Sequence, residues 1–319
     1  MDYLKVIVLI LSYNGKHLLD DSISSYLEND YPNFKVVVID NGSSDSTKEY
    51  IEKNFPEARV IRLEKNRGYS GGFNFGLDYA FNKNNADYVL VTNNDVRADK
   101  RVISELVKVA ETDKRIGFVT GKVYYNDGLN VLQTVGKKWH SILWSGPHIG
   151  ANEKDVGQYE KIEERVFLDD IFTLVPRELY KQTGGYDSQL YLQAEEFDWQ
   201  IQAKKLGWKL YYTPYAKIWH KGSATIGGLG SPISMFFYIR NHMIVIFKHG
   251  NVVQSIRIWF YFLGKNLFAL IKSFLKITLR RKSRLVSHLA GLLGWMSATA
   301  WIIHRKPTRK IPWFIKILK

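Results

Sequence analysis

The sequence has no cysteine among its 319 residues. Disulfide bonds, thiolate zinc sites and cysteine nucleophiles are therefore excluded. The chain also lacks the GK[ST] ending of a P-loop and the G-x-G-x-x-G spacing of a dinucleotide-binding turn. At its N-terminus, MDYLKVIVLILSYNG lacks the basic start and the cleavage site of a signal peptide. Its apolar run is too short to span a bilayer, so we expect a buried first strand.

Acidic residues are missing from the whole C-terminal part of the chain. The last one is Asp198, and residues 231–319 contain 16 Lys and Arg without a single Asp or Glu. Since the chain carries a net charge of +14, the residues before 231 carry −2. We therefore predict a near-neutral globular body followed by a strongly basic tail.

In residues 235–319, apolar and aromatic clusters alternate with Lys and Arg. The longest uncharged stretch, 285–303, is 19 residues long, and basic clusters flank it on both sides. A spanning helix usually has its positive charge on one side, so this symmetry favours helices that lie in the membrane interface. We expect the tail to associate with an anionic membrane surface. The alternative is a basic helical subdomain that packs on the body.

Strand and helix patterns alternate through the first half of the chain. The predicted strands are 5–11, 34–40, 58–64 and 87–92. Helical spacing is found in 17–30 and 103–112, and a glycine-rich helix start in SGGFNFGLDYAFNK. This order predicts an α/β fold with a mostly parallel, Rossmann-like sheet and right-handed crossovers.

Polar clusters follow three of these strands. They are SYNG (12–15), Asp40 with NGSSD (41–45), and Asn93-Asn94-Asp95. Ligands bind at the carboxyl ends of parallel strands, where a carboxylate can accept a hydrogen bond from a base and an aromatic ring can stack on it. Each cluster alone is equally compatible with a turn.

Further along the chain, AEEFDW (194–199) reads as the start of a helix. Glu195 and Asp198 would share one face of it, and Glu196 would point elsewhere. A carboxylate here could act as a general base, although a solvated helix start has the same appearance. His220 follows Trp219, and taken alone it is more typical of a packed residue than of a metal ligand.

The order of these motifs resembles the inverting glycosyltransferases of family 2, which have the GT-A fold. The resemblance covers about residues 5–225. It implies that the first two strand ends and the glycine-rich stretch bind the nucleotide sugar. The residues concerned are Ser12, Tyr13, Asn14, Asp40, Asn66, Gly68 and Asn74, together with Asn93 and Asn94.

The family's D-x-D metal motif corresponds to Asn93-Asn94-Asp95 here. Because its first position is Asn, Asp95 is the remaining carboxylate, and the resemblance implies that His220 shares the Mg²⁺ or Mn²⁺ ion. The family's acidic motif falls on Glu195-Glu196-Phe197-Asp198, and its second acid is the general base. That role corresponds to Glu196, with the choice between Glu195 and Glu196 left open.

The resemblance implies inverting, metal-dependent sugar transfer from a nucleoside-diphosphate sugar, either dTDP-rhamnose or a UDP-sugar. The acceptor would be lipid-linked or a polysaccharide in cell-surface glycan synthesis. The expected location is the cytoplasmic face of the plasma membrane. We expect a GT-A domain in 1–230, with a nucleotide-sugar half in 1–115 and an acceptor half in 116–230. We expect residues 231–319 to form a basic amphipathic helical region that associates with the membrane.

Two other classes of protein compete with this interpretation. A sugar-nucleotide pyrophosphorylase shares the sheet type, but it usually carries a glycine-rich loop with Arg and Lys after its first strand, and SYNGKHLLDDS lacks that loop. A nucleic-acid-binding protein would explain the basic tail. The Phe, Leu and Ile clusters of the tail suit lipid better than phosphate grooves, so we expect no nucleic-acid partner.

Overall fold

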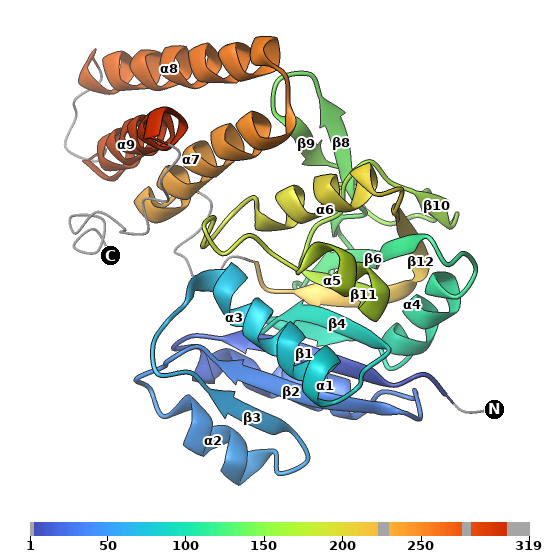
Figure 1. Ribbon diagram of the computed structural model, residues 1–319. Helices are drawn as coiled ribbons and strands as arrows, with labels where there is room; N and C mark the ends of the chain where they lie inside the picture. Colours follow the sequence, from blue (N-terminus) through green and yellow to red (C-terminus); the bar gives the residue numbers. More distant parts are fainter. Residues whose placement is uncertain (1–2, 223–229, 276–281, 305–319) are drawn as a thin grey trace. The chain divides into compact units, whose positions relative to one another are not determined.

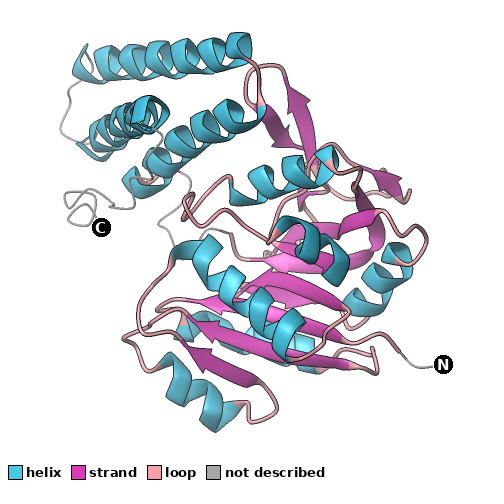
Figure 2. Cartoon of the chain, viewed as in Figure 1, coloured by secondary structure: helices cyan, strands magenta, loops and turns pink. Residues whose placement is uncertain are grey.

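The computed structural model describes residues 3–222, 230–275 and 282–304. Its main sheet has the strand order β10-β12-β6-β11-β4-β1-β2-β3, and helices flank it (Figures 1 and 2). The four N-terminal strands are parallel, as their pattern predicts. They are β1 (Val6–Ser12), β2 (Phe34–Asp40), β3 (Arg59–Arg62) and β4 (Tyr88–Asn93).

The first strand is buried on both faces, which explains its unbroken apolar run. Val6, Val8 and Ile10 belong to one hydrophobic cluster, whereas Ile7 and Leu9 belong to another. Helices α1 (Leu19–Leu27) and α4 (Val102–Ala110) contribute to the first cluster, and α3 (Gly68–Asp78) to the second. The remaining helix of this half is α2 (Thr47–Asn54), and α3 continues into a π-helical turn, Tyr79–Lys83.

The second half of the sheet is mixed in direction. Strand β11 is antiparallel to β4 and β6, and β12 is parallel to β6 and antiparallel to β5 and β10. The bounds are β5 (Val96–Ala98), β6 (Ile116–Tyr125), β7 (Leu132–Thr134), β10 (Glu163–Glu164), β11 (Phe172–Pro176) and β12 (Lys209–His220). Of the apolar stretch RVFLDDIFTLVP, only the last five residues form this strand β11. A two-stranded sheet joins β8 (Lys137–His140) to β9 (Trp144–His148).

The later helices carry end signals that the sequence already displays. Helix α5 (Arg177–Thr183) ends at Gly184, whose φ of 76° is the left-handed conformation that glycine adopts without strain. Helix α7 (Pro232–His249) begins after Ser231, whose hydroxyl accepts a hydrogen bond from Ser234 N at 3.2 Å. The other helices are α6 (Glu195–Lys205), α8 (Val252–Leu275) and α9 (Lys282–His304).

The chain divides into two compact units. We call residues 1–139, 145–188 and 199–222 the sheet unit, and residues 140–144, 189–198 and 223–319 the helical unit. The sheet unit contains the predicted nucleotide and metal residues. The helical unit contains the first turn of α6 together with α7, α8 and α9.

Candidate functional site

Asp40 provides a buried carboxylate at the end of β2. It lies opposite Ser12 in the parallel pairing of β1 and β2, and its side chain is fully buried. Its Oδ1 accepts a hydrogen bond from Ser43 N at 2.9 Å, whereas its Oδ2 accepts none from the described residues. The nearest cation, Arg62 Nε, lies 3.8 Å from Oδ2. A buried carboxylate oxygen without a donor is costly, so this position favours a ligand that brings an N–H or O–H group.

The loops after β1 and β2 are linked through Asn14. Its backbone N–H donates to Ser43 Oγ at 2.9 Å, and its Oδ1 accepts from Ser44 N at 2.8 Å. Asn14 has a φ of 49°, a left-handed conformation in which Asn is enriched. Half-buried Tyr13 precedes it. The two predicted nucleotide-binding loops therefore form one connected surface.

Asn41, which the sequence analysis did not single out, fixes the glycine-rich turn. Its Nδ2 donates to Asn66 Oδ1 at 3.1 Å and to Gly68 O at 3.0 Å, and its Oδ1 accepts from Arg67 N at 2.9 Å. Asn66 Oδ1 in turn accepts from Gly68 N at 2.8 Å, where α3 begins. Asn66 and Gly68 thus lie beside the β2 loop, and their role in binding the donor stays a prediction. In the sequence, Asn41 stands out only as part of an Asn-Gly pair, and such a pair most directly indicates a turn.

Asn74 has a different set of contacts. Its Nδ2 donates to Tyr186 O at 2.7 Å and to Ser188 Oγ at 3.1 Å, and its Oδ1 accepts from Tyr186 N at 2.9 Å. Both amide atoms therefore fasten residues 186–188 to α3. A role in lining the donor site stays a prediction.

Asn94 connects the metal motif to the nucleotide side. Its side chain is buried, and its Nδ2 donates to Ser12 Oγ at 3.3 Å. A Cβ added at Gly15 would lie 2.3 Å from the same Nδ2, so a larger residue in SYNG would displace this amide. The first strand's polar end and the cluster after β4 therefore form one site in the sheet unit.

Asp95 and His220 meet because β5 pairs with the end of β12. In that pairing His220 lies opposite Val96, the residue after Asp95. Asp95 Oδ1 lies 3.0 Å from His220 Nε2, and both side chains are 5% exposed. Asn93 Nδ2 lies 3.4 Å from the same nitrogen. The two residues predicted to share a metal ion are thus in direct contact.

The donor set of this pair fits a divalent cation. His220 Nδ1 lies 2.8 Å from Gln133 Oε1, and an amide oxygen can only accept, so Nδ1 carries the proton. In neutral imidazole, Nε2 then has a lone pair directed at the Asp95 carboxylate. A cation held by both groups would relieve that repulsion. One imidazole and one carboxylate suit Mg²⁺ or Mn²⁺ when phosphate oxygens and water supply the rest of the coordination. Among the residues that the structure describes, no group of three or more His, Asp and Glu completes the site.

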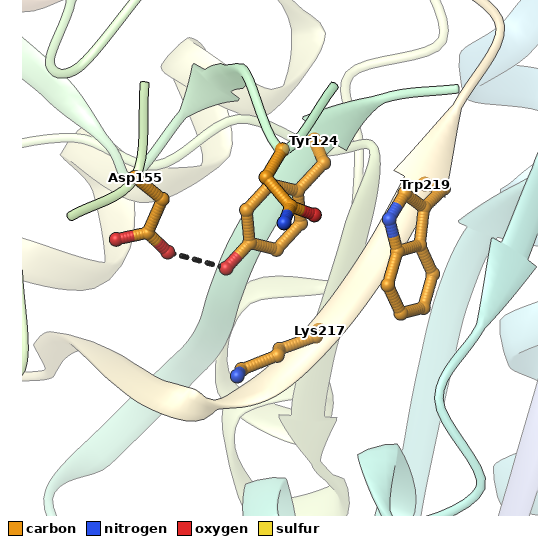
Figure 3. Close-up of a pocket in the computed structure, with 5 residues that line it drawn as sticks. Tyr124, Asp155, Lys217 and Trp219 are labelled. Atoms are coloured by element: carbon orange, nitrogen blue, oxygen red, sulfur yellow. Dashed lines mark hydrogen bonds between the residues drawn. The ribbon is translucent and has the colours of Figure 1, made fainter. Parts of the chain in front are cut away.

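Trp219 stabilises the strand end that carries His220. Arg97 lies over its ring at 4.1 Å, and Tyr124 stacks with it at a centroid distance of 5.8 Å. Successive strand residues point to opposite faces, so Trp219 and His220 face opposite sides of β12. Figure 3 shows Trp219 and Tyr124 in a small open pocket of about 210 Å³, where Tyr124 donates to Asp155 at 2.5 Å. Burial and this hydrogen bond raise the pKa of Tyr124.

The adjacent acids Asp169 and Asp170 are both engaged within the sheet unit. Asp169 is buried, with Lys137 Nζ at 3.0 Å from Oδ1 and His148 Nδ1 at 2.9 Å from Oδ2. Burial alone would raise its pKa, but the charges of Lys137 and His148 outweigh it and hold the pKa well below the usual range. Asp170 accepts hydrogen bonds from Tyr69 and Tyr186. Neither set of partners was predicted from the sequence.

The three acids of α6 differ in environment within the helical unit. Glu195 is buried, Glu196 is half-buried, and Asp198 is buried between two cations of α7. Asp198 lies 2.7 Å from Lys248 Nζ and 2.8 Å from His249 Nε2. Burial would raise its pKa, but these partners lower it. Asp198 is therefore already paired with two basic side chains, and which of the three acids acts as base stays a prediction.

The sequence matches a known family and several curated proteins. The profile of glycosyl transferase family 2 matches residues 7–180. The poly-beta-1,6-N-acetyl-D-glucosamine synthase of Staphylococcus aureus (strain COL) is 24% identical over 232 residues, which cover 72% of this chain and 53% of the synthase. The Staphylococcus epidermidis synthase is 26% identical over 223 residues, 69% of this chain and 51% of that protein. The chain thus spans about half the length of the curated relatives it matches.

Solved structures resemble the fold over nearly the whole chain. S. aureus TarS in complex with UDP-GlcNAc has a TM-score of 0.53 at 18% identity, covering 99% of this chain and 84% of that one. The mannosyltransferase PcManGT from Pyrobaculum calidifontis, in complex with GDP-Man and Mn²⁺, has a TM-score of 0.57 at 16% identity, covering 96% and 88%. At these identities the likeness concerns the fold alone. It confirms the predicted GT-A architecture.

Proposed function

Because this chain belongs to glycosyl transferase family 2, we propose that it transfers a sugar from a nucleoside-diphosphate donor with inversion at the anomeric carbon and with help from Mg²⁺ or Mn²⁺. That it is a glycosyltransferase follows from the family itself. The observation that carries the finer proposal is the continuous row of Asp40, Ser12, Asn94, Asp95 and His220. Asp40, Ser12 and Asn94 lie at or directly after the ends of the neighbouring strands β2, β1 and β4. Asp95 contacts His220 at the end of β12 because β12 pairs with β5.

In this proposal the row of side chains binds the nucleoside diphosphate at both of its ends, the base and the diphosphate. Asp40 Oδ2 accepts an N–H group of the base, and half-buried Tyr13 offers its ring for stacking. Asp95 and His220 bind the metal ion beside the diphosphate. A divalent ion there offsets the negative charge that develops on the leaving group.

Glu196 is our candidate for the general base, which takes the proton from the acceptor hydroxyl as that oxygen attacks the anomeric carbon. Its half-buried side chain is more accessible than that of buried Glu195, and Asp198 already has two basic partners. We expect Glu196→Gln to abolish transfer while nucleotide binding persists, whereas Glu195→Gln retains turnover. Full activity of Glu196→Gln would overturn the assignment.

The relatives support particular classes of sugar donor and of acceptor for this proposal. TarS binds UDP-GlcNAc, and the curated relatives are polysaccharide synthases, which supports a UDP-sugar. A dTDP-sugar such as dTDP-rhamnose is the other candidate. We propose a lipid-linked or polysaccharide acceptor at the cytoplasmic face of the plasma membrane, with residues 1–230 as the catalytic domain and 231–319 as the membrane-associating region.

A thermal-shift screen tests the proposal directly. The full-length protein is heated with UDP-, dTDP- and GDP-sugars, each with and without Mn²⁺. A ligand at about 100 times its Kd adds about 2.7 kcal/mol of stability, enough to raise Tm by several degrees. We expect one nucleotide class to raise Tm, and more so with Mn²⁺. A uniform absence of shifts would contradict the proposal.

A further inference from the structure

Helix α8 presents an apolar side to solvent. Seven of its large hydrophobic side chains are between 45% and 74% exposed. They are Val252, Val253, Ile256, Phe260, Leu267, Phe268 and Ile271. Their spacings of three, four and seven residues place them on one broad side of the helix. We call this set the exposed α8 face.

The opposite side of α8 is packed within the helical unit. Ser255, Ile258, Phe262, Asn266 and Leu270 are buried there. In addition, Trp259 Nε1 donates to Thr299 Oγ1 of α9 at 3.1 Å. Helix α8 is therefore docked through one side on α7 and α9 (Figure 1). The exposed α8 face is what this docking leaves uncovered among the described residues.

Cations accompany the exposed α8 face, and anions do not. Arg257, Lys265 and Lys272 are exposed on the same helix, and residues 231–319 contain no Asp or Glu. A second copy of the chain would bring the same positive charge to such a contact, so self-association is disfavoured. An apolar face with basic residues beside it matches a surface that has acyl chains below and phosphates above.

Helix α9 is the rival for membrane contact. Leu285–His304 has a mean hydropathy of 1.3 and is the only helix among the described residues that is long and apolar enough to cross a bilayer. However, a Cβ at Gly294 would lie 2.4 Å from Phe236 O of α7, and one at Gly291 would lie 2.7 Å from Asn266 Oδ1 of α8. Such close backbone packing makes α9 part of the helical unit. The basic clusters that flank it lie mostly outside the described residues.

We propose that α8 docks this protein on an anionic membrane surface. The exposed α8 face enters the acyl boundary, and Arg257, Lys265 and Lys272 contact lipid phosphates. The inference extends the proposed function, because it names the element that brings a lipid-linked acceptor within reach.

Co-sedimentation of the full-length protein with vesicles tests this docking. Phe260→Asp/Phe268→Asp is compared with wild type and with Leu206→Asp/Tyr215→Asp, which adds the same charges at exposed apolar residues of the sheet unit. On vesicles of phosphatidylcholine and phosphatidylglycerol in equal parts, we expect the α8 variant to bind about tenfold or more weakly. The sheet-unit variant should bind as wild type does. Arg257→Gln/Lys265→Gln should lose the preference over pure phosphatidylcholine.

Two results would overturn the docking inference. One is wild-type vesicle binding by Phe260→Asp/Phe268→Asp. The other is a change from dimer to monomer in that variant without lipid, which would identify a second copy as the occupant. Donor hydrolysis in solution is measured in parallel. If it persists in the α8 variant, the proposed function stands whatever the vesicles show.

A second inference concerns the turn before α6. Three residues of 191–194 have left-handed backbones although none is glycine, with φ of 63° at Tyr191, 70° at Gln193 and 64° at Ala194. Such conformations are costly and persist only when the surroundings impose them. Glu195, the first acid of α6, follows directly.

Two buried residues of α7 impose this turn. Asn241 Nδ2 lies 2.7 Å from each of the carbonyl oxygens of Leu190, Leu192 and Gln193. Arg240 Nη1 donates to Asn241 Oδ1 at 2.6 Å, which orients the amide. Eight residues further along α7, Lys248 and His249 bind Asp198. Helix α7 therefore contacts the chain on both sides of Glu195 and Glu196: at residues 190–193 before them and at Asp198 after them.

We infer that Arg240 and Asn241 are positioning residues for the glutamate that acts as base, an inference that rests on the proposed function. Asn241→Ala is compared with Asn266→Ala, which removes another buried Asn whose amide donates to Phe262 O of its own helix. We expect kcat to fall about tenfold or more in Asn241→Ala, with KM for the donor and nucleotide binding retained. Asn266→Ala should change stability without this effect on kcat.

Equal kcat values for the two Asn variants at matched stability would overturn the positioning role. Glu196→Gln is assayed beside them. If it is inactive while Asn241→Ala is as active as Asn266→Ala, only the positioning inference fails. If Glu196→Gln is fully active, the base assignment in the proposed function fails instead.

Discussion

At the residue scale, Asp40 has two oxygens with unequal surroundings. Oδ1 accepts from Ser43 N, and Oδ2 is buried without a donor among the described residues. In Asp40→Asn the amide oxygen can keep the Ser43 contact, but an NH₂ group then replaces the acceptor. If an N–H group of the nucleotide base binds at this position, that group and the new NH₂ group are both donors and face each other without an acceptor.

We therefore expect Asp40→Asn to weaken binding of the preferred nucleotide by roughly 1–3 kcal/mol, about ten- to a hundredfold. Isothermal titration calorimetry measures the change, with the unfolding midpoint of the free variant recorded as a control for folding. An unchanged Kd in a normally folded variant would show that Asp40 does not contact the base.

Asp169 offers a stability prediction, because it is buried between Lys137 and His148. Removing one partner of a buried ion pair leaves the other charge uncompensated, so Asp169→Asn should lower the free energy of unfolding by about 3–5 kcal/mol near neutral pH. The pKa of Asp169 is lowered in the folded state, so its contribution is present above the unfolded pKa, about 3.9, and is lost as pH falls below it.

Urea unfolding of wild type and Asp169→Asn between neutral and acidic pH measures this contribution. The difference between the two proteins should shrink below about pH 4. A difference that stays constant over this range would mean that the carboxylate's charge is not the source of the stability.

At the element scale, the close packing of α9 on α7 depends on small residues. A Cβ at Gly294 would lie 2.4 Å from a backbone oxygen, whereas one at Gly264, also inside a helix, meets nothing within 4 Å. We expect Gly294→Ala to destabilise the protein by about 1–3 kcal/mol through overpacking. Gly264→Ala should stabilise it by up to about 1 kcal/mol, because alanine has the higher helix propensity.

Thermal or urea unfolding of the two glycine variants measures the difference, and each serves as the control for the other. If Gly294→Ala were as stable as Gly264→Ala, α9 would not pack on α7 in solution. The grounds for preferring α8 as the membrane-contacting helix would then be weakened.

At the scale of the whole molecule, the spacing of apolar residues and the alternation of strand and helix patterns along the sequence predicted the parallel half of the sheet closely. The strand predicted at 34–40 is β2 with the same bounds, and the three others shift by one or two residues at their ends. The contact of Asp95 with His220 depends on the pairing of β5 with β12. These two strands are more than 100 residues apart in the sequence. Only the resemblance to the family linked those two residues in advance.

Other features could not have been predicted from the sequence because they depend on three-dimensional partners. The sequence shows Arg240-Asn241 and Lys248-His249 as polar pairs in an apolar helix, but their partners in 189–198 become visible only once α7 is folded against that segment. Likewise, the hydrogen bonds of Asn74 to Tyr186 join α3 to a segment more than 100 residues away, which the sequence does not show.

The central claim is that Asp95 and His220 together bind the metal ion that secures the donor. Calorimetric titration of the preferred nucleotide sugar, with and without Mn²⁺, tests it in wild type, His220→Ala and His304→Ala, the last replacing an exposed histidine at the end of α9. We expect Mn²⁺ to tighten binding about tenfold or more in wild type and His304→Ala, and to have no effect in His220→Ala. Full Mn²⁺ dependence in His220→Ala would contradict the account.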